Sequence, residues 1–196
     1  TNNTITNMSK IREIQLRKAN LADAEAIAAT RIEAWRTTYR GMIPDTYLDN
    51  MQMEENVLQW RTILQALPAK EDSLRVYVAT SDDEVIGFVS VFKLAEPKLG
   101  KDGEINAIYI RPQWQRCGIG KRMMHKAARS LQEMGCHSCV IWVIDGNSPA
   151  RNFYEELGGE ILIERGGIGR LDDFTDQRAA RLHAAHRRLG ALLDGA

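Results

Sequence analysis

Residues 104–121, which read EINAIYIRPQWQRCGIGK, constrain the fold of this 196-residue chain more than any other segment. The first seven letters are rich in apolar, β-branched and aromatic residues, which is typical of a largely buried strand. Pro112 ends this strand, because proline cannot donate a backbone hydrogen bond. The loop that follows contains Gly118 and Gly120, which let the backbone approach a ligand that a Cβ atom would hold away.

A helix is predicted directly after this loop. Its apolar residues recur at helical spacing, and they are Ile119, Met123, Met124, Ala127, Ala128, Leu131 and Met134. The unpaired N–H groups and the positive dipole end of this helix would face the loop. Such an arrangement is typical of an anion site, and pyrophosphate is the expected ligand.

The spacing excludes two familiar glycine motifs. In a Walker loop the lysine is followed by serine or threonine, whereas Lys121 is followed by Arg122. The dinucleotide fingerprint has a third glycine three positions after the second, where this chain has Met123. What remains is Gln-x-x-Gly-x-Gly after a strand, and such a short motif can also be a tight turn without a ligand.

A second strand and helix are predicted further along the chain. Residues 147–158 read NSPARNFYEELG, which predicts a helix with Asn147 or Ser148 as its cap and Gly158 as its stop. Just before it, the run CVIWVI at residues 139–144 predicts another buried strand.

Together, these two segments resemble the two signature segments of the GNAT N-acetyltransferase superfamily, in the same order and separation. The resemblance covers about residues 11–165. It implies an α/β (α+β) fold with a mixed, mostly antiparallel sheet of about six or seven strands flanked by helices. In this family the sheet is splayed between its fourth and fifth strands, and acetyl-coenzyme A lies in the wedge as the co-substrate.

The N-terminal part fits this order. Residues 1–10 are expected to be disordered, and they contain neither a basic nor an apolar signal region. A first strand is predicted around Ile14 and Leu16. Asn20 then caps a helix, with Asp23 at its third position as in a capping box.

A second helix and a hairpin are predicted next. The helix covers residues 53–67 and is expected to stop at Pro68. Residues 74–80 and 85–94 read as strands, and the letters SDDE between them favour an antiparallel hairpin.

The C-terminal tail, residues 166–196, departs from the family pattern. Residues 161–163 predict a sixth strand, but no β-rich seventh strand is expected after it. Leucine and alanine instead recur at helical spacing, which predicts a helix over about residues 176–193. This atypical helix would cover the domain or a partner subunit, although a replaced tail is an alternative. The family and the apolar helix face favour a homodimer over a monomer.

The resemblance assigns the chemistry to two residues. Glu104, at the start of the wedge strand, is the candidate base that takes a proton from the amine, directly or through water. Tyr154 is the candidate acid beside the thioester sulfur. Each has a plain alternative, an ordinary solvated carboxylate for Glu104 and a core aromatic for Tyr154. Backbone N–H groups in the range 107–109 are expected to polarise the carbonyl.

The same resemblance assigns the cofactor contacts. Backbone groups of the wedge strand are expected to pair with the pantetheine arm, and the loop is expected to surround the pyrophosphate. The predicted cofactor-binding residues are Ile108, Tyr109, Ile110, Gln115, Arg116, Cys117, Gly118, Ile119, Gly120, Lys121, Asn147 and Tyr154. A solvated surface position is the alternative for Arg116, and helix capping is the alternative for Asn147.

Composition narrows the class of partner. The counts of 26 basic and 26 acidic residues argue against an electrostatic nucleic-acid partner, and no apolar run is long enough for a membrane partner. Three cysteines favour free thiols and the cytoplasm. Cys136 and Cys139 form a CxxC without a second pair, so no metal is expected.

The sequence therefore predicts an N-acetyltransferase that moves the acetyl group of acetyl-coenzyme A to a primary amine of a small molecule or peptide. Direct attack in a ternary complex is expected. The alternatives are a GNAT-like cofactor-binding or regulatory module with little turnover, and an acyltransferase for another acyl-coenzyme A. The balanced charge does not identify the amine.

Overall fold

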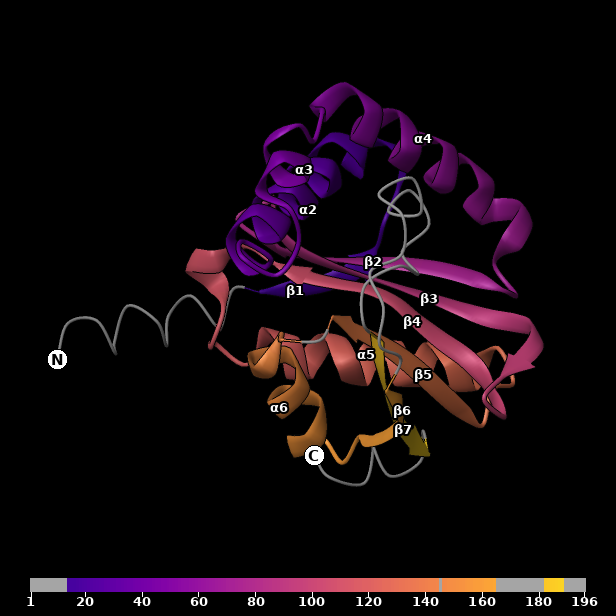
Figure 1. Ribbon diagram of the computed structural model, residues 1–196. Coiled ribbons are helices and arrows are strands. Elements are labelled where there is room, and N and C mark those ends of the chain that lie inside the picture. The colour runs from indigo at the N-terminus through magenta and orange to yellow at the C-terminus, as the bar shows by residue number, and fades with distance from the viewer. Residues whose placement is uncertain (1–13, 145, 165–181, 189–196) are drawn as a thin grey trace, which may run out of the picture.

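The computed structural model describes residues 14–144, 146–164 and 182–188, which form a seven-stranded sheet with helices on both faces (Figure 1). Along the sheet the strand order is β1-β2-β3-β4-β5-β7-β6. The strands are β1 (Gln15–Lys18), β2 (Leu74–Ser81), β3 (Glu84–Lys98), β4 (Lys101–Ile110), β5 (Ser138–Ile144), β6 (Glu160–Glu164) and β7 (Leu182–Arg188). This mixed, mostly antiparallel sheet confirms the predicted fold class.

The helices divide between the two faces of the sheet. The α-helices are α2 (Ala24–Thr38), α3 (Asp45–Asp49), α4 (Met53–Lys70), α5 (Ile119–Glu133) and α6 (Ser148–Glu156). Two short 3₁₀ helices, η1 (Leu21–Asp23) and η2 (Pro112–Trp114), precede α2 and α5. Figure 1 shows α2, α3 and α4 on one side and α5 and α6 on the other. We call these the α2 face and the α5 face.

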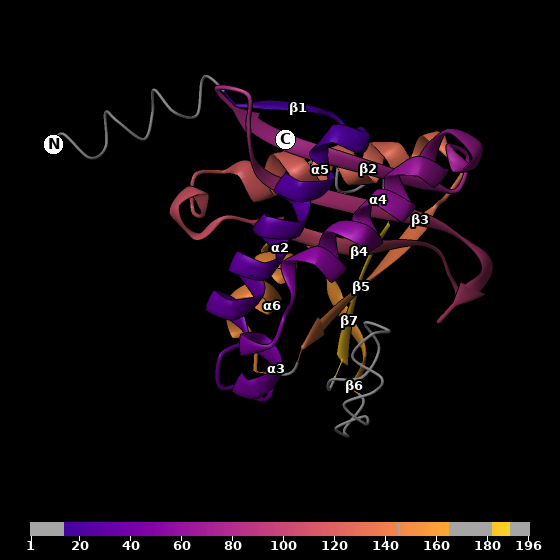
Figure 2. The same cartoon turned by 90° about the horizontal axis from the view of Figure 1, so that it is seen from above.

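The sheet opens between its fourth and fifth strands. β4 and β5 pair in parallel only at Gly103 with Cys139, Glu104 with Val140, and Ile105 with Ile141. Figure 2 shows β5 turning away from β4. Among the described residues, no strand pairs with residues 106–110 of β4 on that side, and we call them the open edge of β4. The predicted splay is confirmed.

A β-bulge lies where the open edge begins. In the pairing of β3 with β4, Ser90 is opposite Ala107 but Val91 is opposite Ile105. Asn106 is thus the extra residue, and such a residue bends a strand and shifts the alternation of its side chains by one position.

Two predictions about helix ends had different outcomes. Asn20 forms the predicted capping box, because its side chain accepts from Ala22 N and its own N–H donates to Asp23 at 2.8 Å. The prediction that Pro68 stops the second helix is wrong, since α4 continues to Lys70. Proline removes a single backbone donor, and so close to a helix end this loss is small.

The prediction of an atypical C-terminal helix is wrong for residues 182–188. They form β7, a seventh strand that pairs antiparallel with β5 from Leu182 to Arg188 and with β6 on its other side. The helix propensities of most residue types differ by less than about 1 kcal/mol, so backbone hydrogen bonds to a strand on each side of β7 outweigh them. The rest of that helix and residues 1–10 lie outside the described residues.

Within the described residues, no helix has both the length and the apolar character that a membrane span needs.

Asp102 ties the start of β4 to the start of β5, far from the open edge. Its carboxylate accepts from the backbone N–H groups of His137 at 2.8 Å and Ser138 at 2.9 Å, and from the Ser138 hydroxyl at 3.0 Å. Burial alone would raise the pKa of Asp102, but these hydrogen bonds outweigh it and lower the pKa to about 2. The charged form is therefore the one that stabilises the fold.

We expect Asp102→Asn to lower the free energy of unfolding at pH 7 by about 1 to 2 kcal/mol, allowing for solvent screening at this partly exposed carboxylate. Because the folded-state pKa is lowered, the contribution is complete above the ordinary pKa of about 3.8 and is lost as the pH falls through about 2. Urea unfolding from pH 7 to pH 2 measures both effects. Glu96→Gln, at an exposed carboxylate of β3, should change stability by less than about 0.5 kcal/mol. An equal acid limb in wild type and Asp102→Asn would contradict this account.

Candidate active site

The open edge of β4 presents the backbone groups of Ile108 and Ile110. The N–H of Arg111 donates to Ile86 of β3 at 2.9 Å, so by alternation the backbone groups of Tyr109 also face β3. Those of Ile108 and Ile110 face the opposite way, toward the side that β5 has left. Within the predicted range 107–109, alternation thus directs the N–H of Ile108, rather than that of Tyr109, toward this side.

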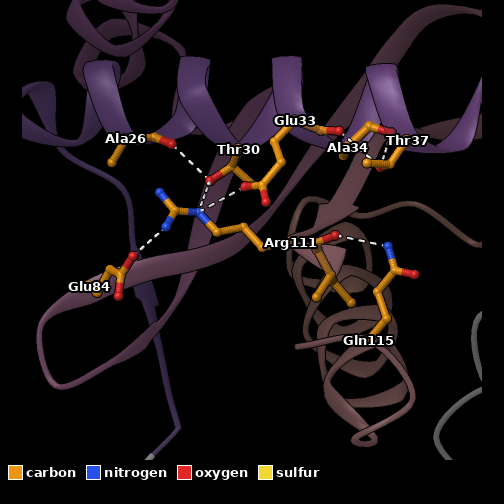
Figure 3. A network of polar contacts seen from close by, with 9 residues as sticks. Ala26, Thr30, Glu33, Ala34, Thr37, Glu84, Arg111 and Gln115 are labelled. Carbon is orange, nitrogen blue, oxygen red and sulfur yellow. Dashed lines mark hydrogen bonds and ion pairs between the residues drawn. The ribbon is translucent and has the colours of Figure 1, made fainter. Parts of the chain in front are cut away.

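Gln115 folds back onto this edge. Its side-chain amide donates to the carbonyl of Ile110 at 3.1 Å (Figure 3). This contact joins the glycine loop to the last residue of β4 and shows that the Ile110 carbonyl is able to accept a hydrogen bond from the open side. An extended ligand with amide groups could use the same acceptor.

The glycine loop leads into the N-terminus of α5. Arg116 and Gly118 have left-handed backbone conformations, with φ of 60° and 77°. Gly118 is the N-cap of α5, and no side chain of the described residues caps it. The first N–H groups of α5 therefore face the loop, as an anion site requires.

The other loop residues complete this cradle. Gln115 and Arg116 are exposed, and Cys117 is half-buried with its thiol 3.4 Å from the Gln115 carbonyl. A Cβ atom on Gly120 would lie 3.1 Å from the Phe153 ring, so glycine permits a close approach of α5 and α6. The loop residues predicted from the sequence therefore lie, together with Ile119 and Lys121, at the N-terminus of α5.

Arg111 anchors the start of this loop to α2. Figure 3 shows its guanidinium between Glu84, Glu33 and Thr30. It donates to Glu84 and to the Thr30 hydroxyl at 3.3 Å, and it lies 3.7 Å from the Glu33 carboxylate. Since Arg111 follows β4 directly, this network holds the end of the open edge against the helix that covers the α2 face.

Tyr154 on α6 is buried, with 8% of its surface exposed, and packs beside Phe153 on the α5 face. Burial raises the pKa of Tyr154 well above its ordinary value, and the phenol of Tyr109 raises it further. Burial, Tyr109 and Tyr154 also raise the pKa of Tyr39. The phenols of Tyr154 and Tyr39 therefore keep their protons at neutral pH and can only donate or accept as O–H groups.

Glu104 lies on the α2 face. A Cβ atom on its neighbour Gly103 would lie 3.0 Å from Leu131 of α5, so position 103 faces α5. Side chains alternate along a strand, so the Glu104 side chain points to the opposite face. The Glu104 residue is 8% exposed, and its carboxylate accepts from Lys98 Nζ at 3.0 Å. Because of the bulge, Tyr109 lies on the same face, where it packs against apolar residues of α2, α3 and α4.

An aromatic cluster covers the α2 face beside the open edge. Trp35 of α2 is its centre, with ring centroids 5.1 Å from Tyr39, 6.2 Å from Tyr47 and 6.4 Å from Tyr109. Trp60, by contrast, packs edge-on against Phe88 in the core. Trp35, Tyr39 and Tyr47, which come from α2, its C-terminal end and α3, thus form one cluster with Tyr109.

Sequence reasoning missed Arg31 in this cluster. The apolar face of α2 runs through Ile27 and Trp35, and Arg31 lies four residues from each. Its guanidinium carbon is 4.6 Å from the centre of the Trp35 ring. A cation at a buried helical position was the signal that could have revealed it.

Asn147, Cys136 and Cys139 have structural surroundings. The Asn147 side chain caps α6 by accepting from Ala150 N at 3.2 Å. Cys136 and Cys139 are buried, and burial raises the pKa of both thiols. Among the residues with described positions, no cluster of three or more histidine, cysteine or acidic side chains is suited to a metal.

Comparison with known proteins gives a consistent result. Residues 32–159 match the Acetyltransferase (GNAT) family. The chain is 33% identical over 153 residues to the uncharacterized N-acetyltransferase YuaI of Bacillus subtilis, covering 77% of this chain and 83% of that protein. It is 23% identical to a spermidine N(1)-acetyltransferase of Thermoplasma acidophilum, covering 76% and 89%.

Solved structures agree on the fold. The PaiA N-acetyltransferase of Thermoplasma acidophilum in complex with coenzyme A superposes with a TM-score of 0.70 at 20% identity, covering 89% of this chain and 98% of that one. The structure of YncA from Salmonella typhimurium with acetyl-CoA gives a TM-score of 0.65 at 17% identity, covering 90% and 94%.

Proposed function

This chain belongs to the GNAT acetyltransferase family, and on that premise we propose that it transfers the acetyl group of acetyl-coenzyme A to a primary amine by direct attack in a ternary complex. The single observation that carries the proposal is the open edge of β4, which ends at a loop and a helix N-terminus that no described side chain caps. A mobile pantetheine arm needs the first feature, and a pyrophosphate needs the second.

Coenzyme A fits the residues at this edge. Ile108 and Ile110 would pair with the amides of the pantetheine arm, with Tyr109 between them. The loop residues Gln115–Gly120 and Lys121 would surround the pyrophosphate. When bound, acetyl-coenzyme A supplies an acetyl group that is activated as a thioester.

Glu104 and Tyr154 would manage the protons. An alkylammonium has a pKa near 10.4, so at neutral pH it must lose a proton before it can attack. Glu104, a buried carboxylate on the α2 face, would take that proton directly or through water. Tyr154 keeps its proton because of burial and would donate it to the departing sulfur.

The acceptor class is supported by the names of relatives. They include a spermidine acetyltransferase and a mouse thialysine N-epsilon-acetyltransferase, which is 23% identical over 160 residues. Spermidine and thialysine are both amines, so we infer that this chain also binds an amine acceptor, on the α2 face. A homodimer remains a prediction.

A thiol-release assay with the purified protein tests this function. With acetyl-coenzyme A and a panel of polyamines, amino acids and peptides, at least one amine should release free coenzyme A and yield an acetylated product by mass spectrometry. If acetyl-coenzyme A raises the Tm but no amine releases thiol, the transferase proposal is wrong and a cofactor-binding module is correct.

The glycine loop gives a further prediction. Gly118→Ala should lower the free energy of unfolding by about 1 kcal/mol, because a Cβ atom strains a left-handed residue. It should also raise KM for acetyl-coenzyme A about tenfold by disturbing backbone donors to the pyrophosphate. Gly100→Ala is the matched control, since Gly100 has φ of 72° and equally open surroundings in another turn. It should lose similar stability in urea unfolding and leave KM unchanged. Equal KM in all three proteins would contradict the cradle.

A further inference from the structure

Arg31 is a buried cation whose hydrogen-bond partner among the described residues is neutral. Its residue surface is 7% exposed, and its guanidinium stacks on Trp35. Its hydrogen-bond partner is the neutral side-chain oxygen of Asn56 on α4. Nowhere in the described ranges does a carboxylate pair with it. A buried charge is costly unless something neutralises it.

Other shielded arginines of this fold have acidic partners. Arg75, with 13% of its side chain exposed, pairs with Glu133 at 2.6 Å. Arg111, at 17%, pairs with Glu84 and Glu33. Arg31 therefore stands out by facing an amide where an acid would fit.

Asn56 is fixed in this orientation. Its amide nitrogen donates to the Gln52 carbonyl at 2.7 Å, which directs its oxygen toward Arg31. One guanidinium N–H is thereby satisfied, but arginine has five. Among the described residues, only the side-chain nitrogens of Trp35 and Trp60 are both fully buried and without a hydrogen-bond partner. The Arg31 nitrogens that do not bond to Asn56 are therefore partly exposed to solvent. No described residue accepts a hydrogen bond from the Trp35 N–H.

The position of Arg31 is on the acceptor side. Its stacking partner Trp35 contacts Tyr109 of the open edge, at 6.4 Å between ring centroids. Glu104, the candidate base, lies on the same face of β4 as Tyr109. The α2 face thus has a carboxylate for an ammonium group and, separately, an uncompensated guanidinium.

We propose that Arg31 binds a carboxylate of the amine acceptor, so that the acceptor is an amino acid rather than a simple polyamine. This inference rests on the proposed function. The planar guanidinium suits a carboxylate because it can donate two parallel hydrogen bonds. The bound carboxylate would neutralise the Arg31 charge. Asn56 is neutral and does not neutralise that charge itself, so the guanidinium can pair with the acceptor.

Matched acceptors test the inference. Lysine and cadaverine differ only by the carboxylate, as do ornithine and putrescine. The wild-type kcat/KM should be at least about tenfold higher for the amino acid of the preferred pair, as expected for charge-assisted hydrogen bonds. Equal or better use of the decarboxylated amines would overturn the inference and leave the transferase function intact. Absence of thiol release with every amine would overturn both.

Two variants locate the effect. Asn56→Asp supplies an internal anion, so it should keep the fold and reduce the preference for the amino acid at least about tenfold, through KM for that acceptor. KM for acetyl-coenzyme A should not change. Asn50→Asp, which adds the same charge at an exposed position, is the control and should keep the preference. Arg31→Gln should behave like Asn56→Asp if it folds. An unchanged preference in Asn56→Asp would overturn the role of Arg31.

Discussion

Tyr154→Phe should lower kcat about 100-fold while leaving KM for acetyl-coenzyme A within about twofold of the wild-type value. The substitution removes one hydroxyl from a buried ring that packs beside Phe153, so the packing of α6 should survive. Because burial keeps this phenol protonated, its loss should affect the departure of the thiolate rather than cofactor binding. Steady-state kinetics with both substrates separates the two effects.

Tyr77→Phe is the matched control. The Tyr77 hydroxyl lies 3.0 Å from the Ser130 hydroxyl in the core, and it takes no part in the proposed chemistry. Its removal should lower the free energy of unfolding by about 1 kcal/mol and leave kcat unchanged. Wild-type turnover by Tyr154→Phe would show that Tyr154 is only a core aromatic.

Glu104→Gln should lower kcat/KM for the amine about 100-fold at pH 7. Without a base, the reaction depends on the small fraction of amine that is already neutral. The rate of the variant should therefore rise with pH, and the deficit should narrow as the pH approaches the amine pKa near 10.4. A pH–rate profile of both proteins, normalised to folded protein, measures this.

The ion pair of Glu104 provides the control for this result. Lys98 donates to the carboxylate at 3.0 Å but is 41% exposed. Lys98→Gln should change kcat/KM by less than about threefold, because exposed pairs contribute little. A uniform deficit of Glu104→Gln at every pH would argue against a base and for a positioning role.

Local patterns explain what the sequence predicted well. The capping box at Asn20, the apolar runs of β4 and β5, and the helical spacing of α5 are local signals, and each appears where it was expected. The order of these elements was enough for the resemblance that identified the splayed sheet.

The errors arise where distant segments decide the outcome. LHAAHRR has the composition of a helix, yet as β7 it lies between β5 and β6, whose pairing no local pattern reveals. Arg31 was missed because its significance depends on its neighbours in space, where the described partner is the neutral side chain of Asn56. The bulge at Asn106 is likewise visible only in the register with β3.

The insertion of β7 between β5 and β6 also sets an order of maturation. During synthesis β6 emerges before β7. It cannot join the sheet until Leu182–Arg188 has left the ribosome and has paired with both β5 and β6. Until then β5 has a vacant outer edge next to the opening in the sheet. A nascent chain can therefore assemble its β1–β4 half early, whereas its β5 half, with Tyr154 on the helix before β6, is completed only after residues 182–188 have been synthesised.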